Sequence, residues 1–259
     1  MLFRSFLSLC HPKATNVEAL SKNRLKWIRS LQLKKNRDAA GLFVVEGEKM
    51  VLEVLQEPFA ESVVEVVSLK EHTNLIPKSQ QGITKTASVQ EMEQISALRT
   101  PNKLLAVVRI PKLSEPQAVR TIVLDGVQDP GNMGTILRLA DWFGISQLVC
   151  SLDTVDCFNS KVVQASMGAI FRIKVHYVEL PTYLKHVNQP IFGALLEGKP
   201  YRTVEYPENA ILIMGNEGKG IRPENIPLIQ TAVTIPKFGE AESLNVAAAT
   251  AILLAEMVK

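Results

Sequence analysis

The sequence predicts an α/β protein whose C-terminal part forms a mostly parallel β-sheet covered by helices. From Arg120 onward, short runs with strand composition alternate with stretches of helical composition. The strand-like runs are apolar on both faces, which is typical of strands buried between two helical layers. These runs are residues 121–127, 147–151, 174–178, 191–196, 211–214 and 231–235. A second, smaller α/β unit is expected before them, in residues 22–110.

Composition bounds the classes of protein that this chain can represent. Its 259 residues, 46% of them hydrophobic, are enough for one large or two modest domains. Cys10, Cys150 and Cys157 are odd in number and far apart, so neither a disulfide framework nor a paired metal motif is predicted. The four histidines also lack the spacing of metal ligands, and we expect no metal site. Scattered free cysteines favour a reducing compartment, and we expect a cytoplasmic protein.

The first 16 residues have no assigned role in the predicted fold. Arg4, Ser5 and Ser8 interrupt a short apolar run, and no small-residue cleavage site follows it. We expect a disordered extension, with a targeting segment or an upstream start codon as alternatives. No run approaches the length of a membrane span, so no membrane partner is expected.

The smaller unit begins with a strongly basic segment. Residues 22–37 contain seven lysines and arginines and no acidic residue, and Ser21 is a suitable N-cap. We expect one basic helix that contacts RNA phosphates, although a solvated charged face would have the same composition. The candidate RNA contacts are Lys22, Arg24, Lys34, Lys35 and Arg37.

The rest of this unit alternates strands and helices. Residues 41–45, 62–69 and 104–110 have strand composition, and residues 48–56 have helical composition. Ser88 and Glu91 have the spacing of a capping box, so another helix should begin there. Two prolines and no periodicity follow at residues 111–116, which we interpret as the linker between domains.

Ligands of open parallel sheets bind outside the carboxyl ends of the strands, so the loops after strands are the candidate site. The first loop, within residues 124–138, enters a helix near Asn132, which could cap it. Arg138 follows among apolar residues, and we expect it to be largely buried. A buried arginine requires an anion, which could be a ligand or a structural partner such as Asp141.

Two further loops combine glycine with polar residues. In residues 211–220, Gly215 and Gly218 permit a close approach of the backbone, and Glu217 would be costly if it had no role. In residues 235–246, Ser243 is expected to cap the last helix, and Asn245 lies in the first turn as a poor helix former. A flexible turn and a capped helix with a surface asparagine are the alternatives.

Read together, the three loops resemble the motifs of the SpoU/TrmH family of RNA methyltransferases, within the SPOUT superfamily. Asn132-x-Gly134-x-x-x-Arg138 is similar to the first motif and Met214-Gly-Asn-Glu-Gly218 to the second. Ile235-Pro-x-x-Gly239-x-x-x-Ser243-Leu-Asn-Val246 is similar to the third, and the order and spacing agree. Residues 22–110 also resemble the family's RNA-binding domain, of the ribosomal-protein L30e type.

The resemblance implies a division of the chain into an extension (1–16), an L30e-like RNA substrate-binding domain (17–110), a linker (111–118) and a methyltransferase domain (119–259). It implies an α/β knot, a parallel sheet whose last loops form a deep trefoil that binds S-adenosylmethionine. It also implies a homodimer packed through the knot. The implied catalytic residues are Asn132, Arg138, Glu217, Ser243 and Asn245, and the implied cofactor contacts are Leu195, Gly215, Asn216, Gly218, Ile235 and Leu244.

The expected reaction transfers a methyl group from S-adenosylmethionine to a ribose 2′-hydroxyl of ribosomal or transfer RNA. The family assigns the general base to the position of Arg138, but a guanidinium does not readily lose its proton, and an electrostatic clamp is the alternative. A non-catalytic RNA-binding dimer that keeps the knot for dimerisation is the rival interpretation. Base methylation is disfavoured by the Ser-Leu-Asn of the third motif.

Overall fold

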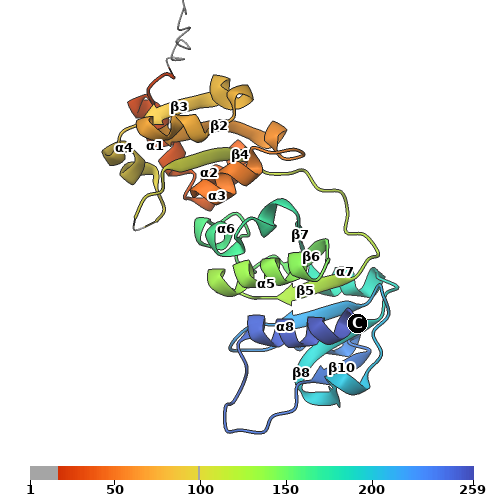
Figure 1. The fold of residues 1–259 in the computed structure, drawn as a ribbon. Coiled ribbons are helices and arrows are strands. Elements are labelled where there is room, and N and C mark those ends of the chain that lie inside the picture. Colours follow the sequence, from red (N-terminus) through yellow and green to blue (C-terminus); the bar gives the residue numbers. More distant parts are fainter. Residues whose placement is uncertain (1–16, 99) are drawn as a thin grey trace, which may run out of the picture.

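The computed structural model describes residues 17–98 and 100–259, which form two sheets joined by an extended segment (Figure 1). The expected extension, residues 1–16, lies outside the described residues. The larger sheet has the strand order β10-β8-β9-β5-β6-β7, and all of its pairs are parallel, as the sequence predicted. Its strands are β5 (Thr121–Asp125), β6 (Gln147–Ser151), β7 (Lys174–Val178), β8 (Ile191–Pro200), β9 (Ile211–Gly215) and β10 (Thr231–Thr234).

Helices cover both faces of this sheet. In β5, Ile122 and Leu124 belong to the apolar cluster shared with α5, α6 and α8, whereas Val123 belongs to the cluster shared with α7. The alternation explains why the strands read as apolar on both faces. The helices are α5 (Pro130–Trp142), α6 (Ser160–Ser166), α7 (Leu180–His186) and α8 (Val246–Met257).

The carboxyl end of β5 lies at the point where the strand order reverses. The chain builds β6 and β7 on one side of β5, and β9, β8 and β10 on the other. In open α/β sheets the crevice at such a switch point binds ligands. The loop that leaves β5 is the first of the three candidate loops.

The smaller sheet has the order β1-β4-β2-β3, antiparallel except for the β2–β3 pair. Its strands are β1 (Leu42–Glu46), β2 (Val63–Leu69), β3 (Thr84–Ala87) and β4 (Leu104–Arg109), of which β3 was not predicted. Its helices are α1 (Lys22–Ser30), α2 (Lys34–Ala40), α3 (Glu48–Val54) and α4 (Val89–Ile95). Short 3₁₀ helices are η1 (Ala60–Ser62), η2 (Lys70–Leu75), η3 (Lys78–Ile83), η4 (Ala169–Phe171), η5 (Tyr201–Thr203) and η6 (Ile226–Leu228).

Several helix boundaries differ from the predicted ones. The basic segment forms two helices rather than one, because the chain turns between Ser30 and Lys34. The Ser21 cap and the Ser88–Glu91 capping box are confirmed. The side chain of Asp129, rather than Asn132, caps α5.

The two sheets pack against each other through α6, which lies between the smaller sheet and α5 (Figure 1). Gly134 of α5 allows this, because a β-carbon there would overlap Ala165 of α6. The rings of Phe43 in β1 and Phe158, just before α6, have centroids 4.7 Å apart. The buried apolar cluster therefore continues from one sheet to the other.

Candidate functional site

A chain of three polar side chains joins the three candidate loops at the carboxyl edge of the larger sheet. The Nδ2 of Asn132, in the first turn of α5, donates to Oε1 of Glu217 at 3.0 Å. The Nδ2 of Asn245, just before α8, donates to Oδ1 of Asn132 at 2.8 Å. Glu217 therefore holds the amide of Asn132 in one orientation. Residues 113 positions apart in sequence meet through one hydrogen bond.

The side-chain amide of Asn245 uses its oxygen to cap a helix and its nitrogen to bind Asn132. Its Oδ1 accepts from the backbone N–H groups of Ala247 at 2.9 Å and Ala248 at 3.2 Å, which makes Asn245 the N-cap of α8. The expectation that Ser243 caps this helix is wrong, because α8 begins at Val246. Two donors at Oδ1 fix the orientation of the amide, so its Nδ2 must point toward Asn132.

The loop after β9 is folded tightly on itself. The backbone N–H and C=O of Asn216 both pair with Gly220, each at 2.9 Å, and Asn216 Oδ1 accepts from the N–H groups of Gly218 and Lys219 at 3.0 Å. A β-carbon on Gly215 would lie under 3.0 Å from backbone atoms of Gly220 and Ile221. The fold of this loop therefore requires glycine at position 215, whereas a β-carbon at Gly218 would meet only the side chain of Asn216, at 3.8 Å.

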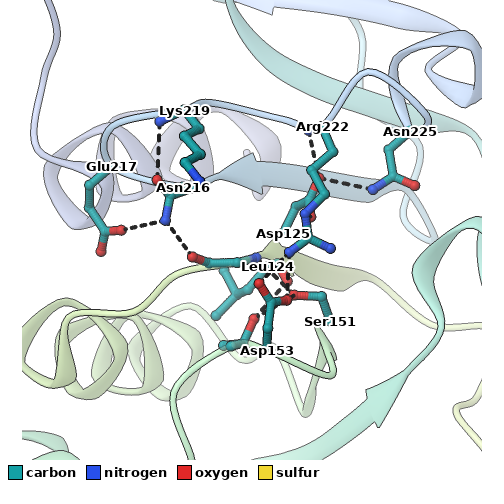
Figure 2. Close-up of polar contacts among 11 residues, drawn as sticks. Leu124, Asp125, Ser151, Asp153, Asn216, Glu217, Lys219, Arg222 and Asn225 are labelled. Carbon is teal, nitrogen blue, oxygen red and sulfur yellow. Dashed lines mark hydrogen bonds and ion pairs between the residues drawn. The ribbon is translucent and has the colours of Figure 1, made fainter.

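A buried carboxylate beneath this loop was not predicted (Figure 2). Asp125, the last residue of β5, is fully buried, and its Oδ2 accepts from Arg222 N at 2.8 Å and Asn225 Nδ2 at 2.9 Å. Arg222 Nη2 binds both carboxylate oxygens of Asp153 at 2.5 Å. Burial raises the pKa of Asp153, but hydrogen bonds from Arg222 and Ser151 outweigh it, so the pKa lies below its ordinary value.

Arg138 corrects the expectation of a buried arginine. Its side chain is exposed and forms no hydrogen bond or ion pair with any residue that the structure describes. Asp141, its proposed structural partner, instead binds Arg172 through three N–H···O contacts of 2.8 to 3.0 Å. Arg138 and Trp142, which is 84% exposed, lie one turn apart on the outer face of α5. The guanidinium is therefore free to bind an external anion.

The candidate cofactor residues lie partly at the same edge. Thr234 Oγ1 donates to Leu196 O at 2.9 Å, which joins the end of β10 to the middle of β8 beside Leu195 and Ile235. Ser243 and Leu244 lie in residues 236–245, every one of which is exposed. Large apolar side chains are exposed in this region, namely Leu196, Phe238 and Leu244. The edge therefore combines tightly turned backbone with uncovered apolar side chains.

The candidate RNA contacts divide into free and occupied side chains. Lys22 and Lys35 are exposed and form no ion pair within the described part of the chain. Arg24 binds Glu65 at 2.7 Å and lies over the ring of Trp27, and Lys34 binds Asp38 at 2.8 Å. Arg37 is a correction, because it is 2% exposed and its guanidinium binds Asp156 in the larger sheet's domain. It cannot contact RNA while it holds that partner.

No group of three or more histidine, cysteine, aspartate or glutamate side chains could hold a metal ion among residues 17–98 and 100–259. None of the helices in this same part of the chain has the length and hydrophobicity needed to cross a bilayer. Cys150 and Cys157 are buried free thiols, and burial raises the pKa of both.

Comparisons with known proteins agree with this geometry. The SpoU rRNA Methylase family model matches residues 120–255, and the MRM3-like substrate binding domain model matches residues 22–106. The 23S rRNA (guanosine(2553)-2′-O)-methyltransferase RlmP of Bacillus subtilis strain 168 is 33% identical over 92% of this chain and 97% of its own length.

Solved structures match over nearly the whole length. A protein from Porphyromonas gingivalis assigned to the TrmH family of RNA methyltransferases has a TM-score of 0.83 and 38% identity, over 92% of this chain and 98% of that one. An rRNA methyltransferase from Sinorhizobium meliloti, solved with AdoMet bound, has a TM-score of 0.81 and 28% identity, over 93% and 96%. The α/β fold with a parallel sheet is therefore shared with these proteins.

Substitutions of Asn245 test whether its side chain stabilises the protein by capping α8. Asn245→Ala should lower the free energy of unfolding by about 1 kcal/mol, because α8 loses its cap. Asn245→Asp should lower it by less than Asn245→Ala, because both variants lose the donor to Asn132 but a carboxylate still caps the helix and favours its N-terminus. Denaturant unfolding monitored by circular dichroism measures both. Equal losses in the two variants would contradict the capping role.

Proposed function

The chain belongs to the SpoU rRNA Methylase family, and we propose that it transfers a methyl group from S-adenosylmethionine to the 2′-hydroxyl of a ribose in ribosomal RNA. It is an S-adenosylmethionine-dependent RNA methyltransferase. The observation that carries the proposal is the hydrogen-bonded chain of Glu217, Asn132 and Asn245, which unites the three loops that resemble the family's motifs. The activities of the Bacillus and Sinorhizobium relatives support the reaction and its cofactor.

The loops at the carboxyl edge fit S-adenosylmethionine, which supplies an electrophilic methyl group when it is bound. The crowded backbone at Gly215 leaves no room for a side chain, and we propose that the tight turn which results forms one wall of the cofactor site. The exposed side chains of Leu196 and Leu244 offer apolar surface nearby. We assign the cofactor contacts to Leu195, Gly215, Asn216, Gly218, Ile235 and Leu244.

The catalytic assignments follow from which polar groups are free and which are occupied. Both ends of the Asn132 amide are occupied, so Asn132 positions Asn245 and Glu217. Arg138 is unpaired among the described side chains, and it binds the phosphate next to the target ribose and stabilises the alkoxide that forms there. Ser243 is exposed just before the α8 cap and orients the ribose. Holding the hydroxyl in line with the methyl carbon supplies much of the rate.

We assign a separate function to the domain of each sheet. We assign residues 119–259 to methyl transfer, residues 17–110 to an L30e-like domain that binds the RNA, and residues 111–118 to the linker. The match to a substrate-binding family model and the free side chains of Lys22 and Lys35 support the RNA-binding assignment. The chain leaving β10 through residues 235–245 returns as α8 against α5, and we propose that this passage completes a trefoil knot.

We also propose that two copies of the chain form a homodimer through the knot domain. Trp142 and Phe238 are 84% and 98% exposed, and aromatic side chains are enriched at protein interfaces. Arg138 lies on the same face of α5 as Trp142, which would place it near the interface. Sedimentation equilibrium distinguishes the dimer from a monomer.

Binding of the cofactor separates the enzyme from a non-catalytic RNA-binding dimer. Isothermal calorimetry should show saturable binding of S-adenosylmethionine to the wild type. Gly215→Ala should abolish the binding, because the added methyl group collides with the backbone of Gly220 and Ile221. Gly82→Ala, where a β-carbon meets no atom within 4 Å, is the matched control and should bind normally. Absence of binding by the wild type at millimolar ligand would favour the non-catalytic protein.

Substitutions of Arg138 distinguish stabilisation of charge from proton transfer. Arg138→Met should lower kcat for RNA methylation roughly 100-fold, because a donor that stabilises the developing charge is lost. Its affinity for S-adenosylmethionine should not change. Arg138→Lys keeps the charge, and it should retain more activity with no new ionisation in the pH–rate profile between about pH 7 and pH 10. A rate that rises as the introduced amine deprotonates would instead support proton transfer at this position.

A further inference from the structure

The segment between β6 and α6 carries two acidic side chains that bind two different parts of the protein. Asp153 binds Arg222, which ends the loop after β9. Asp156, three residues later, binds Arg37 of α2 in the smaller sheet's domain. Neither pair belongs to the three motif loops, and neither was predicted from the sequence.

The Asp153 end holds the loop that we assign to the cofactor (Figure 2). Arg222 Nη2 would lie 3.0 Å from a β-carbon at Gly126, so the ion pair lies directly over this glycine, whose φ is +77°. The carbonyl of Gly126 accepts from Asn216 Nδ2 at 2.6 Å, and Asn216 in turn organises the turn at Gly218 and Lys219. The ion pair is thus one contact away from the residues that shape the loop.

The Asp156 end holds the substrate-binding domain. Arg37 Nη1 donates to Leu31 O at 2.9 Å and Gln32 O at 2.8 Å, so its guanidinium closes the α1–α2 corner while it binds Asp156. The side chains of Arg37 and Asp156 are only 3% and 13% exposed. Asp156 Oδ1 also accepts from Phe158 N at 3.1 Å, next to the ring contact between Phe158 and Phe43.

Residues 154, 155 and 157, in the middle of the segment, each form hydrogen bonds with other parts of the larger sheet's domain. Thr154 Oγ1 donates to Leu124 O at 3.2 Å, and Val155 N donates to Val127 O at 2.9 Å, both in the chain that enters the first motif loop. Tyr177 Oη donates to Val155 O at 2.7 Å and accepts from Cys157 N at 2.8 Å. These contacts hold the segment against the end of β5, the first motif loop and β7.

We propose that residues 151–159 form a positioning segment that sets the cofactor loop and the RNA-binding domain in one fixed relation. Asp153 and Asp156 are its positioning residues. Buried or partly buried ion pairs contribute little net stability but require one geometry, which suits such a role. The fixed relation would determine which ribose of the bound RNA reaches the methyl group. The inference rests on the proposed function for the identity of the loop and of the domain.

The test replaces each carboxylate by its amide and measures two properties of the full chain. Asp153→Asn should raise the dissociation constant for S-adenosylmethionine about tenfold in calorimetry, because a charged hydrogen bond that supports the loop is weakened. It should also speed hydrogen exchange in residues 216–222 and leave residues 31–40 unchanged. Asp156→Asn should affect only the other end of the segment. Exchange should become faster in residues 31–40, and the affinity for S-adenosylmethionine should stay within twofold of the wild type.

Asp141→Asn is the matched control, because Asp141 also binds an arginine through both oxygens but outside the segment. It should change neither the affinity nor the exchange of the two regions. Wild-type affinity in Asp153→Asn, or unchanged exchange of residues 31–40 in Asp156→Asn, would overturn the inference. Parallel losses of both properties in both variants would indicate general destabilisation and would also overturn it. Failure of the wild type to bind S-adenosylmethionine would refute the proposed function, while the exchange measurements would still decide on the segment.

Discussion

The structure depends most on a single buried charge, the carboxylate of Asp125 at the end of the central strand β5. It has no exposed surface, and an uncompensated carboxylate in such a place costs several kcal/mol. Arg222 and Asn225 must therefore lie against it, and this brings the loop after β9 onto the end of β5. Asp153 binds the outer side of Arg222 and adds the end of β6. The ends of β5, β6 and β9 are thereby joined through Asp125, Arg222 and Asp153.

Neutral amides organise the outer part of the same edge. Asn216 folds its own loop, and Asn132 connects Glu217 to Asn245, which caps α8. Each of these amides uses both its donor and its acceptor within the protein. Arg138 and Ser243, in contrast, are exposed and form no ion pair or side-chain hydrogen bond with the described residues. The three amides therefore shape the site, whereas Arg138 and Ser243 are available to a substrate.

Much of this arrangement could be predicted from the sequence because it depends on local patterns. The parallel strands read as apolar runs, and three of the loops at their ends carried recognisable motifs. Arg138 was placed wrongly, because the apolar residues around it in sequence lie on the opposite side of α5. The contacts of Arg37 with Asp156 and of Arg222 with Asp153 join residues 119 and 69 positions apart, and no local pattern indicates such pairs. Arg37 consequently looked like one more cation of a basic helix.

The central claim is that this edge methylates a ribose of ribosomal RNA. The most direct test maps 2′-O-methylation across ribosomal RNA from cells with and without the gene. The account predicts that one or a few 2′-O-methyl groups of ribosomal RNA disappear without the gene and return when the wild-type gene is restored. An unchanged map of ribosomal RNA would contradict it.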